Sequence, residues 1–145
     1  MKSKWTIVAA GILVATLIPI PYLASSEWSV MVVDEGGKPI QGLLVRLDYQ
    51  DFSTERVSRE EDRNTDESGR ATFAMHRASA SALRRCYYTA LSATALAHAS
   101  FGPSAYVNVF GDHFEGSATN GRFVYFWTGH PDRVESRIIA HPMKD

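Results

Sequence analysis

The sequence predicts an all-β domain, a sandwich of about seven short strands, preceded by one apolar N-terminal helix. Three observations predict it. Clusters of glycine, proline and acidic residues divide the chain into short runs, apolar and polar residues alternate within several runs, and the first residues are almost purely apolar. The length of 145 residues, with 45% hydrophobic and 21% charged residues, suits one globular domain. We therefore expect an N-terminal segment over residues 1–26 and a sandwich over residues 27–145.

Residues 1–26 have the composition of a targeting or anchoring segment. Lys2 and Lys4 give a positive start, residues 5–24 are almost wholly apolar, and small residues follow from Ala24. This order is typical of a secretory signal peptide that is removed after export. About 20 apolar residues also suffice for a transmembrane helix across a ~30 Å hydrocarbon core, so a retained anchor in the membrane is the alternative. Both alternatives predict export to the periplasm or cell envelope, with the retained form held in the inner membrane.

Two strands are predicted at the start of the domain. Residues 29–34 form a first apolar strand that stops at the turn over residues 35–39, which is rich in glycine and proline. Residues 43–50 then alternate between apolar and polar, as a strand with one buried face does. The residues of its apolar face are Leu43, Val45, Leu47 and Tyr49.

The next segment, residues 51–69, carries many charges and few apolar side chains. We expect a solvated loop there, with one edge strand near residues 56–58. A turn at residues 66–69 ends the loop and leads into a further strand. The inward residues of that strand are Ala71, Phe73 and Met75.

Residues 78–97 allow two interpretations. Many alanines and no glycine or proline favour a helix, with Ser79 as its N-cap, and this helix would be an insertion into the sandwich. The apolar residues at helical spacing are Leu83, Tyr87, Leu91 and Ala95. A strand is the alternative, because tyrosine and threonine at residues 87–89 favour strands.

The last part of the chain contains three predicted strands. The first begins at Ser104, and a loop over residues 111–122 follows it. Residues 122–128 are apolar on both faces, which predicts a central strand. Residues 133–140 form a final amphipathic strand. The inward residues of the first and last of these strands are Ala105, Val107 and Val109, and Val134, Ile138 and Ala140.

Two stretches of the chain resemble carboxypeptidase regulatory-like domains. The strand at residues 30–34 with the Gly-Lys-Pro-Ile-Gln-Gly turn at residues 37–42 resembles the opening of that family, and Thr-Asp-x-x-Gly at residues 65–69 is similar to its second signature. The resemblance covers residues 28–75 and implies a prealbumin-like (transthyretin-like, Ig-like) sandwich of seven strands. In such turns Asp66 would accept hydrogen bonds from its own turn, and Gly69 would take a positive φ.

The same superfamily contains enzymes whose signatures this chain lacks. The 5-hydroxyisourate hydrolases end in Tyr-Arg-Gly-Ser, which is not found at residues 140–145. Intradiol ring-cleaving dioxygenases hold iron with two tyrosines and two histidines. Residues 102–106 resemble the Gly-Pro start of that site, but no His-x-His pair follows. We therefore expect no catalytic residues, no metal site, no cofactor and no catalytic activity in this domain.

Five residues are candidates for ligand binding. Asp112 and His113 follow a strand, and His130 lies in a turn, so that a metal site or an acid–base pair would form if both loops met at one end of the sandwich. Tyr125 and Trp127 would form an aromatic platform for a carbohydrate if their face were exposed. The alternatives are surface histidines and buried core aromatics.

Composition narrows the possible functions. With 15 Lys+Arg against 16 Asp+Glu, the chain has no positive field that would favour nucleic acid. The single cysteine, Cys86, excludes an internal disulfide, and we expect it to be buried and inert. We expect a non-catalytic, exported or membrane-anchored module of the cell envelope that binds or positions a partner, either an envelope protein or a glycan. A carbohydrate-binding or small-ligand-binding domain is the alternative, followed by a metal-dependent enzyme built on the loops.

Overall fold

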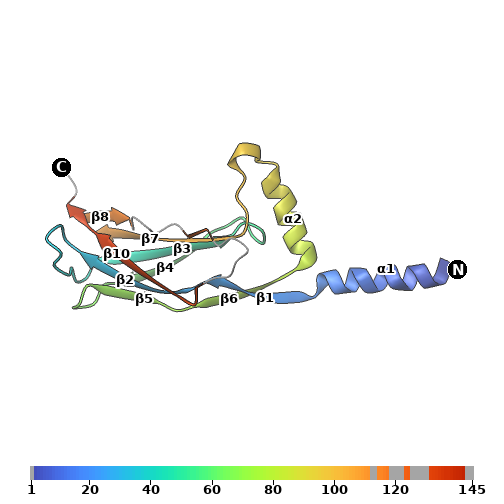
Figure 1. Ribbon diagram of the computed structural model, residues 1–145, viewed down its shortest axis with the longest axis horizontal. Coiled ribbons are helices and arrows are strands. Elements are labelled where there is room, and N and C mark those ends of the chain that lie inside the picture. The colour runs from blue at the N-terminus through green and yellow to red at the C-terminus, as the bar shows by residue number, and fades with distance from the viewer. Residues whose placement is uncertain (1, 112–113, 118–122, 125–130, 143–145) are drawn as a thin grey trace.

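The structure is a computed structural model that describes residues 2–111, 114–117, 123–124 and 131–142. Two β-sheets pack against each other, and two helices lie outside them (Figure 1). The predicted all-β sandwich is therefore confirmed as a fold class. The described residues form eleven strands rather than about seven. Several of the additional strands lie in segments where apolar and polar residues do not alternate. These strands form by pairing with segments that are distant in the sequence.

The strands follow one another along the chain with two helices and one 3-10 turn between them. They are β1 Pro19–Ser25, β2 Glu27–Val33, β3 Leu44–Asp51, β4 Arg59–Asn64, β5 Arg70–Phe73, β6 His76–Ser81, β7 Pro103–Gly111, β8 Phe114–Ser117, β9 Phe123–Val124, β10 Arg133–Ile139 and β11 His141–Pro142. The helices are α1 Lys2–Leu17 and α2 Ala82–Ala93, and the 3-10 turn η1 is Leu96–His98.

The larger sheet has the strand order β11-β8-β7-β3-β4, with β9 also paired to β7. The smaller sheet has the order β10-β2-β5, in which β10 runs parallel to β2. A separate two-stranded ribbon joins β1 to β6. Strands β4 and β5 are thus the outer strands of their sheets on the same side of the sandwich, and this side carries the cleft described below.

The core lies between the two sheets and contains nearly all of the predicted inward residues, together with Ala24, Trp28, Val30 and Val32, which the sequence did not assign to it. Trp28, Leu47, Phe73 and Ile138 are its largest fully buried side chains. The alternating residues of β3 and β7 point into it, as predicted, because one face of each strand covers the smaller sheet. Met75 follows β5 and is only half-buried.

The edge strand expected near residues 56–58 lies instead at β4, which consists entirely of charged and polar residues. Its pairing with β3 brings Arg46 Nε to 2.7 Å from Asp62 Oδ1 and Arg46 Nη1 to 2.9 Å from Glu60 Oε2. The backbone pairing with β3, with these ion pairs beside it, accounts for a strand in a segment without apolar alternation. Charges on an outer strand also oppose pairing with other chains.

Residues 78–97 begin as a strand and continue as a helix. Strand β6 ends at Ser81, and α2 follows, with the Ser81 hydroxyl accepting the N–H of Arg84 at 3.2 Å. The predicted cap, Ser79, lies inside the strand, where it is opposite Pro21. The prediction missed this strand because its partner, β1, lies in the segment assigned to targeting. None of the residues of α2 is buried, so the apolar residues at helical spacing do not enter the core.

Two predictions near the C-terminus are corrected. The predicted loop over residues 111–122 contains β8, which pairs with β7 and so extends the larger sheet. The predicted central strand over residues 122–128 is described only at β9, which pairs with Ser104 and Ala105 of β7. Residues 125–128 lie outside the described part of the chain.

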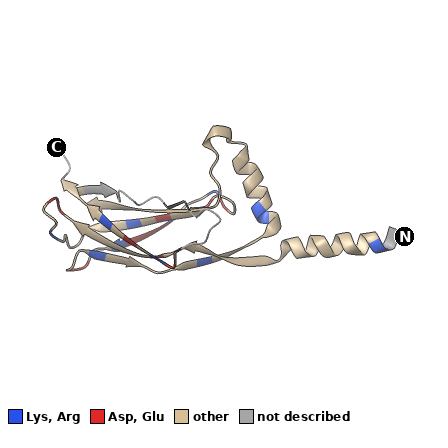
Figure 2. Cartoon of the chain, viewed as in Figure 1, with Lys and Arg blue, Asp and Glu red and all other residues tan. Residues whose placement is uncertain are grey.

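Helix α1 is the predicted apolar helix, but it is shorter than residues 5–24. It ends at Leu17, because Pro19 and Pro21 cannot continue a helix and instead begin β1. Figure 2 shows no charged residue along α1 beyond its first turn. Among the described residues, the structure contains no helix long and apolar enough to cross a membrane.

Gly69 has a backbone conformation that residue types other than glycine do not adopt easily. Its φ is +72°, and an added Cβ would lie 2.7 Å from the Val32 carbonyl oxygen. Gly42 has a similar φ of +80°, but an added Cβ there would meet no atom within 4 Å.

We expect Gly42→Ala to lower the free energy of unfolding by about 1–2 kcal/mol, the cost of the left-handed backbone. Gly69→Ala should cost a further ~1–3 kcal/mol because the extra methyl group overpacks the turn. Urea unfolding measures both values, and equal losses would contradict the close approach.

Candidate functional site

The five sequence-predicted site residues are not placed by the structure. Asp112, His113, Tyr125, Trp127 and His130 all lie outside the described residues. The site described here is therefore built from other residues.

A cleft of about 630 Å³ opens on the side of the sandwich where β4 and β5 are the outer strands. Strand β5 pairs with β2 on one side, and its other side faces the cleft. Outer strands expose backbone N–H and C=O groups that an extended partner segment can bind. The cleft is lined by Glu27, Arg63, Asn64, Asp66, Arg70 and residues 71–74.

The charged side chains of the cleft are held in place by hydrogen bonds. Arg70 Nη1 donates to Ser29 Oγ at 2.7 Å. Asp66 Oδ1 accepts the Ser68 hydroxyl at 2.7 Å and the backbone N–H of Arg70 at 2.9 Å. These hydrogen bonds lower the pKa of Asp66, and the hydrogen bond from the Ser68 hydroxyl has the largest effect. The Asp66 carboxylate is therefore charged at neutral pH. The cleft thus presents fixed groups of both signs.

Beside the cleft, β4 and β6 are joined by a histidine and a carboxylate. His76 Nε2 lies 2.7 Å from Glu61 Oε2, and the His76 ring stacks on Tyr49 with ring centroids 5.0 Å apart. Burial alone would raise the pKa of Glu61, but hydrogen bonds from Arg63 and His76 outweigh it and lower the pKa. No spacing in the sequence indicated this pair, because Glu61 and His76 belong to strands that were not predicted there.

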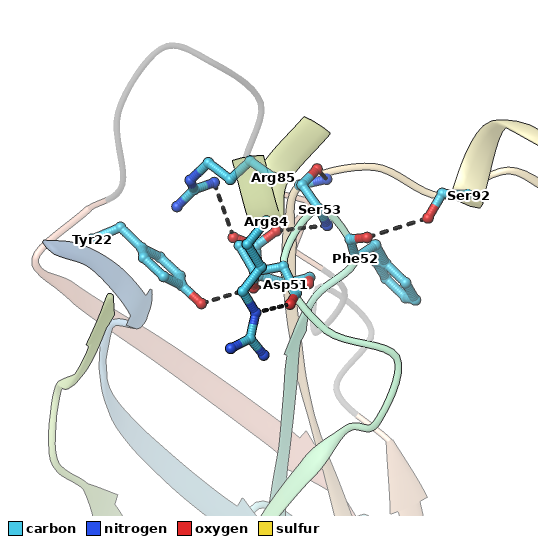
Figure 3. Close-up of polar contacts among 9 residues, drawn as sticks. Tyr22, Asp51, Phe52, Ser53, Arg84, Arg85 and Ser92 are labelled. Carbon is cyan, nitrogen blue, oxygen red and sulfur yellow. Dashed lines mark hydrogen bonds and ion pairs between the residues drawn. The ribbon is translucent and has the colours of Figure 1, made fainter. Parts of the chain in front are cut away.

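A second polar cluster lies where α2 meets the end of β3 (Figure 3). Arg85 Nη1 is 3.3 Å from Asp51 Oδ2, and the Arg85 guanidinium lies 4.4 Å from the centre of the Tyr22 ring. The hydroxyl groups of Tyr22 and Thr54 are 2.9 Å apart. The cluster therefore joins β1, the end of β3 and the first turn of α2.

Further hydrogen bonds hold one side of α2 against the loop after β3. Arg84 Nε donates to the Thr54 carbonyl at 2.7 Å, and the Ser92 hydroxyl donates to the Phe52 carbonyl at 3.2 Å (Figure 3). Because these contacts are polar, they fix the position of α2 without burying its apolar residues. The sequence showed no sign of this arrangement beyond the two adjacent arginines.

Asp51 is the carboxylate of this cluster, and its side chain is only 1% exposed. Burial raises the pKa of Asp51 above its ordinary 3.8, although the Ser53 N–H and Arg85 partly oppose the effect. A raised native pKa means that the folded state binds the proton more tightly than the unfolded state. Stability from this group is therefore present at low pH and is lost as the pH rises from about 3.8 through the native pKa.

We expect Asp51→Asn to remove this pH dependence. The asparagine oxygen still accepts the Ser53 N–H, which Asp51 Oδ1 accepts at 2.9 Å. The variant should gain stability relative to the wild type as the pH rises above about 4, with the difference levelling off above the native pKa. Urea unfolding of both proteins at a series of pH values measures the difference. A difference that stays constant, or that falls with pH, would contradict the raised pKa.

The described residues do not supply a metal site. Among them, no three His, Cys, Asp or Glu side chains gather closely enough to hold a metal ion. Cys86 is exposed on α2 rather than buried, which corrects the expectation from the sequence. It is exposed because α2 lies outside the sandwich.

Comparison with known proteins gives one structural likeness. No family model and no curated protein matches this chain. A matching solved structure is the crystal structure of 3-chlorocatechol 1,2-dioxygenase from Rhodococcus opacus 1CP, with a TM-score of 0.48 and 16% sequence identity. The match covers 83% of this chain and 62% of the dioxygenase chain, so this chain spans less than two thirds of that protein.

This likeness corrects one prediction. The sequence predicted a domain without catalytic activity, whereas the matched structure is that of an enzyme, and we withdraw that prediction. At 16% identity the match transfers no reaction and no residue roles to this chain.

Proposed function

We propose that this chain is an exported β-sandwich module that is held at a membrane by α1 and binds a partner of the cell envelope. The observation that carries the proposal is the surface of α1. Its apolar side chains are exposed all around the helix, including Trp5 at 72%, Ile12 at 62% and Leu17 at 53%. A helix that is apolar on every side is stable in lipid but not in water. Its 16 residues give a length of roughly 24 Å, shorter than the ~30 Å hydrocarbon core, so the proposal is that α1 enters the bilayer and not that it spans the bilayer alone.

Retention of the N-terminal segment is favoured over its removal. Cleavage after Ser26 would remove all of β1, which pairs with β6 from Pro19 to Ser25. Ala24 belongs to the core cluster, and the Ser26 hydroxyl donates to the Pro131 carbonyl at 2.6 Å. A segment that completes the fold is poorly suited to be discarded. The proposed location is therefore the outer side of the inner membrane, facing the periplasm.

The sandwich is proposed to be of the carboxypeptidase regulatory-like, prealbumin-like kind. Its second turn supports this, because Asp66 Oδ1 accepts the backbone N–H groups of Ser68 at 2.8 Å and Arg70 at 2.9 Å. Gly69 takes the positive φ expected of that turn, and Ile40 packs against the core.

The cleft beside β5 is the proposed partner site. An envelope protein would bind there by adding an extended segment along the free edge of β5. A carbohydrate or other small ligand is the second candidate, favoured by the hydrogen-bonding groups of Arg63, Asn64 and Thr72 in the cleft.

A glycan array distinguishes the two candidates. Glycan binding that is lost in Arg63→Glu, but kept in Arg59→Glu outside the cleft, would favour the carbohydrate ligand. Absence of glycan binding would favour the protein partner.

Cell fractionation tests the membrane proposal. We expect the full chain in the membrane fraction after a high-salt wash, with residues 2–17 intact. Ile12→Lys places a charge in the apolar part of α1, where a charge at the centre of a membrane helix costs about 2.5–3.5 kcal/mol, and should shift the protein to the soluble fraction, whereas Ile12→Leu should not. Recovery of the wild type in the cytosol, or of a mature protein that begins at Glu27, would contradict retention.

A further inference from the structure

We propose that α2 lies flat on the surface of the bilayer that α1 enters, with the side of α2 that faces away from the sandwich in contact with lipid. This inference rests on the proposed membrane retention of α1. It assigns α2 and the turn η1 to a second, interfacial membrane contact of the same chain.

The two sides of α2 differ in chemistry. The side held to the sandwich carries Arg84, Arg85 and Ser92, whose hydrogen bonds and ion pair reach the end of β3 and the loop after it (Figure 3). The opposite side carries residues at spacings of three and four, which lie on one face of a helix. These residues are Leu83, Cys86, Tyr87 and Ala90, and all of them are exposed. Leu83 is 49% exposed and Tyr87 61%.

The sequence stays free of charged residues beyond α2, and two large apolar side chains after the helix are exposed. No Lys, Arg, Asp or Glu occurs between Arg85 and Asp112 in the sequence. Within that stretch Leu96 is 83% exposed and Phe101 is 44% exposed. Figure 2 shows α2 free of charged residues after its first turn. Several exposed large apolar side chains are typical of an interaction surface.

Leu96 is both exposed and held in an unfavourable backbone conformation. Its φ is +49°, in the left-handed region that leucine rarely adopts and that costs about 1–2 kcal/mol. The Leu96 carbonyl accepts the N–H of Ala99 at 3.0 Å, which fixes this turn. In water an exposed leucine does not compensate for such strain, whereas burial of the side chain in lipid would.

The positions of the two helices fit a single bilayer. Pro19, which follows α1, is paired with Ser81, which precedes α2, so that the adjoining ends of the helices lie side by side. From this point α1 points away from the sandwich, and α2 runs crosswise to it (Figure 1). With α1 entering the bilayer, α2 lies along its surface, between the bilayer and the sandwich. Ile18 and Ile20, both 56% exposed, continue the apolar surface through the junction.

Lipid explains both apolar surfaces at once. A second protein covering α2 would leave the neighbouring surface of α1 exposed, whereas one bilayer covers α1, the junction and the outer side of α2 together. Tyrosine is also enriched at membrane interfaces, and a helix that lies there has one apolar face and one charged or polar face, as α2 does.

The only cysteine of the chain allows a direct test. Cys86 lies on the outer side of α2 and accepts a nitroxide label without any substitution. The labelled full chain is reconstituted in vesicles of equal parts phosphatidylcholine and phosphatidylglycerol, and flotation shows whether the protein binds them. Power-saturation spectroscopy then measures access of oxygen, which concentrates in lipid, and of a water-soluble nickel chelate. We expect high oxygen access and low nickel access at Cys86.

A matched label provides the control. Cys86→Ser combined with Glu67→Cys places the nitroxide in the exposed turn between β4 and β5, at the other end of the sandwich (Figure 1). Nickel access there should be several-fold higher than at Cys86. Replacing Leu83 and Tyr87 together by Glu should make Cys86 accessible to nickel while α1 still holds the protein on the vesicles, and circular dichroism checks that the variant is folded.

Each outcome decides the proposal. Flotation with equal nickel access at both labels would overturn the interfacial helix and leave the membrane retention of α1 intact. Failure to float would overturn both. Low access of both oxygen and nickel at Cys86 would show that protein, such as a second copy of this chain, covers α2 instead of lipid.

Discussion

Removing residues 1–26 is expected to lower the free energy of unfolding by about 3–5 kcal/mol, whereas removing residues 1–17 should leave it nearly unchanged. The first truncation deletes both α1 and β1, whereas the second deletes only α1. Strand β1 contributes six residue pairs with β6, and each net hydrogen bond is worth about 0.5–1.5 kcal/mol. It also contributes Ala24 to the core and the hydroxyl group of Tyr22 to the contact with Thr54.

Urea unfolding followed by tryptophan fluorescence distinguishes the two truncations, which both lack Trp5 and both keep Trp28. A domain of this size has a total stability of about 5–15 kcal/mol, so the shorter protein is expected to be only marginally folded. Equal unfolding midpoints would show that β1 is dispensable, and a removable signal peptide would then explain the N-terminal segment better than a retained one.

Replacing Phe73 by alanine should lower the free energy of unfolding by about 3–5 kcal/mol. Phe73 is completely buried, stands opposite Trp28 in the pairing of β5 with β2, and is one of the largest side chains between the sheets. The adjacent Thr72 points to the other face of β5 and is exposed. Thr72→Ala should therefore change the stability by no more than about 0.5 kcal/mol. A small effect of both substitutions would mean that the sheets are not packed through Phe73.

The strands of the core could be predicted because alternation is a local property. In β3 and β7 every second residue is apolar, and these residues are buried whatever the topology of the sheets. The turn at Gly69 was equally local, since an aspartate and a glycine at that spacing satisfy their own backbone. Neither feature needed information from a distant part of the chain.

The candidate site could be predicted only in part, because β5 and the turn before it have a local signal but other strands in and beside the site do not. Strand β4 consists of charged and polar residues and forms by pairing its backbone with β3, with Arg46 on β3 adding ion pairs to its carboxylates. Strand β6 forms because β1 lies beside it, although the sequence around Pro19 and Pro21 resembles the end of a signal peptide. The cleft needs the outer strands of two different sheets on one side of the sandwich, which is a matter of topology.

The sequence by itself therefore determined the class of fold, the core residues of the alternating strands and the apolar nature of α1. Hydrophobic burial depends on the composition and period of each segment, and both can be read locally. Only the tertiary structure decided that residues 19–25 belong to the sandwich, that Cys86 is exposed, and that the start of α2 lies beside the end of α1 in space. These facts depend on which distant segments pair, and the hydrogen bonds of a strand are satisfied by a partner that its own sequence does not specify.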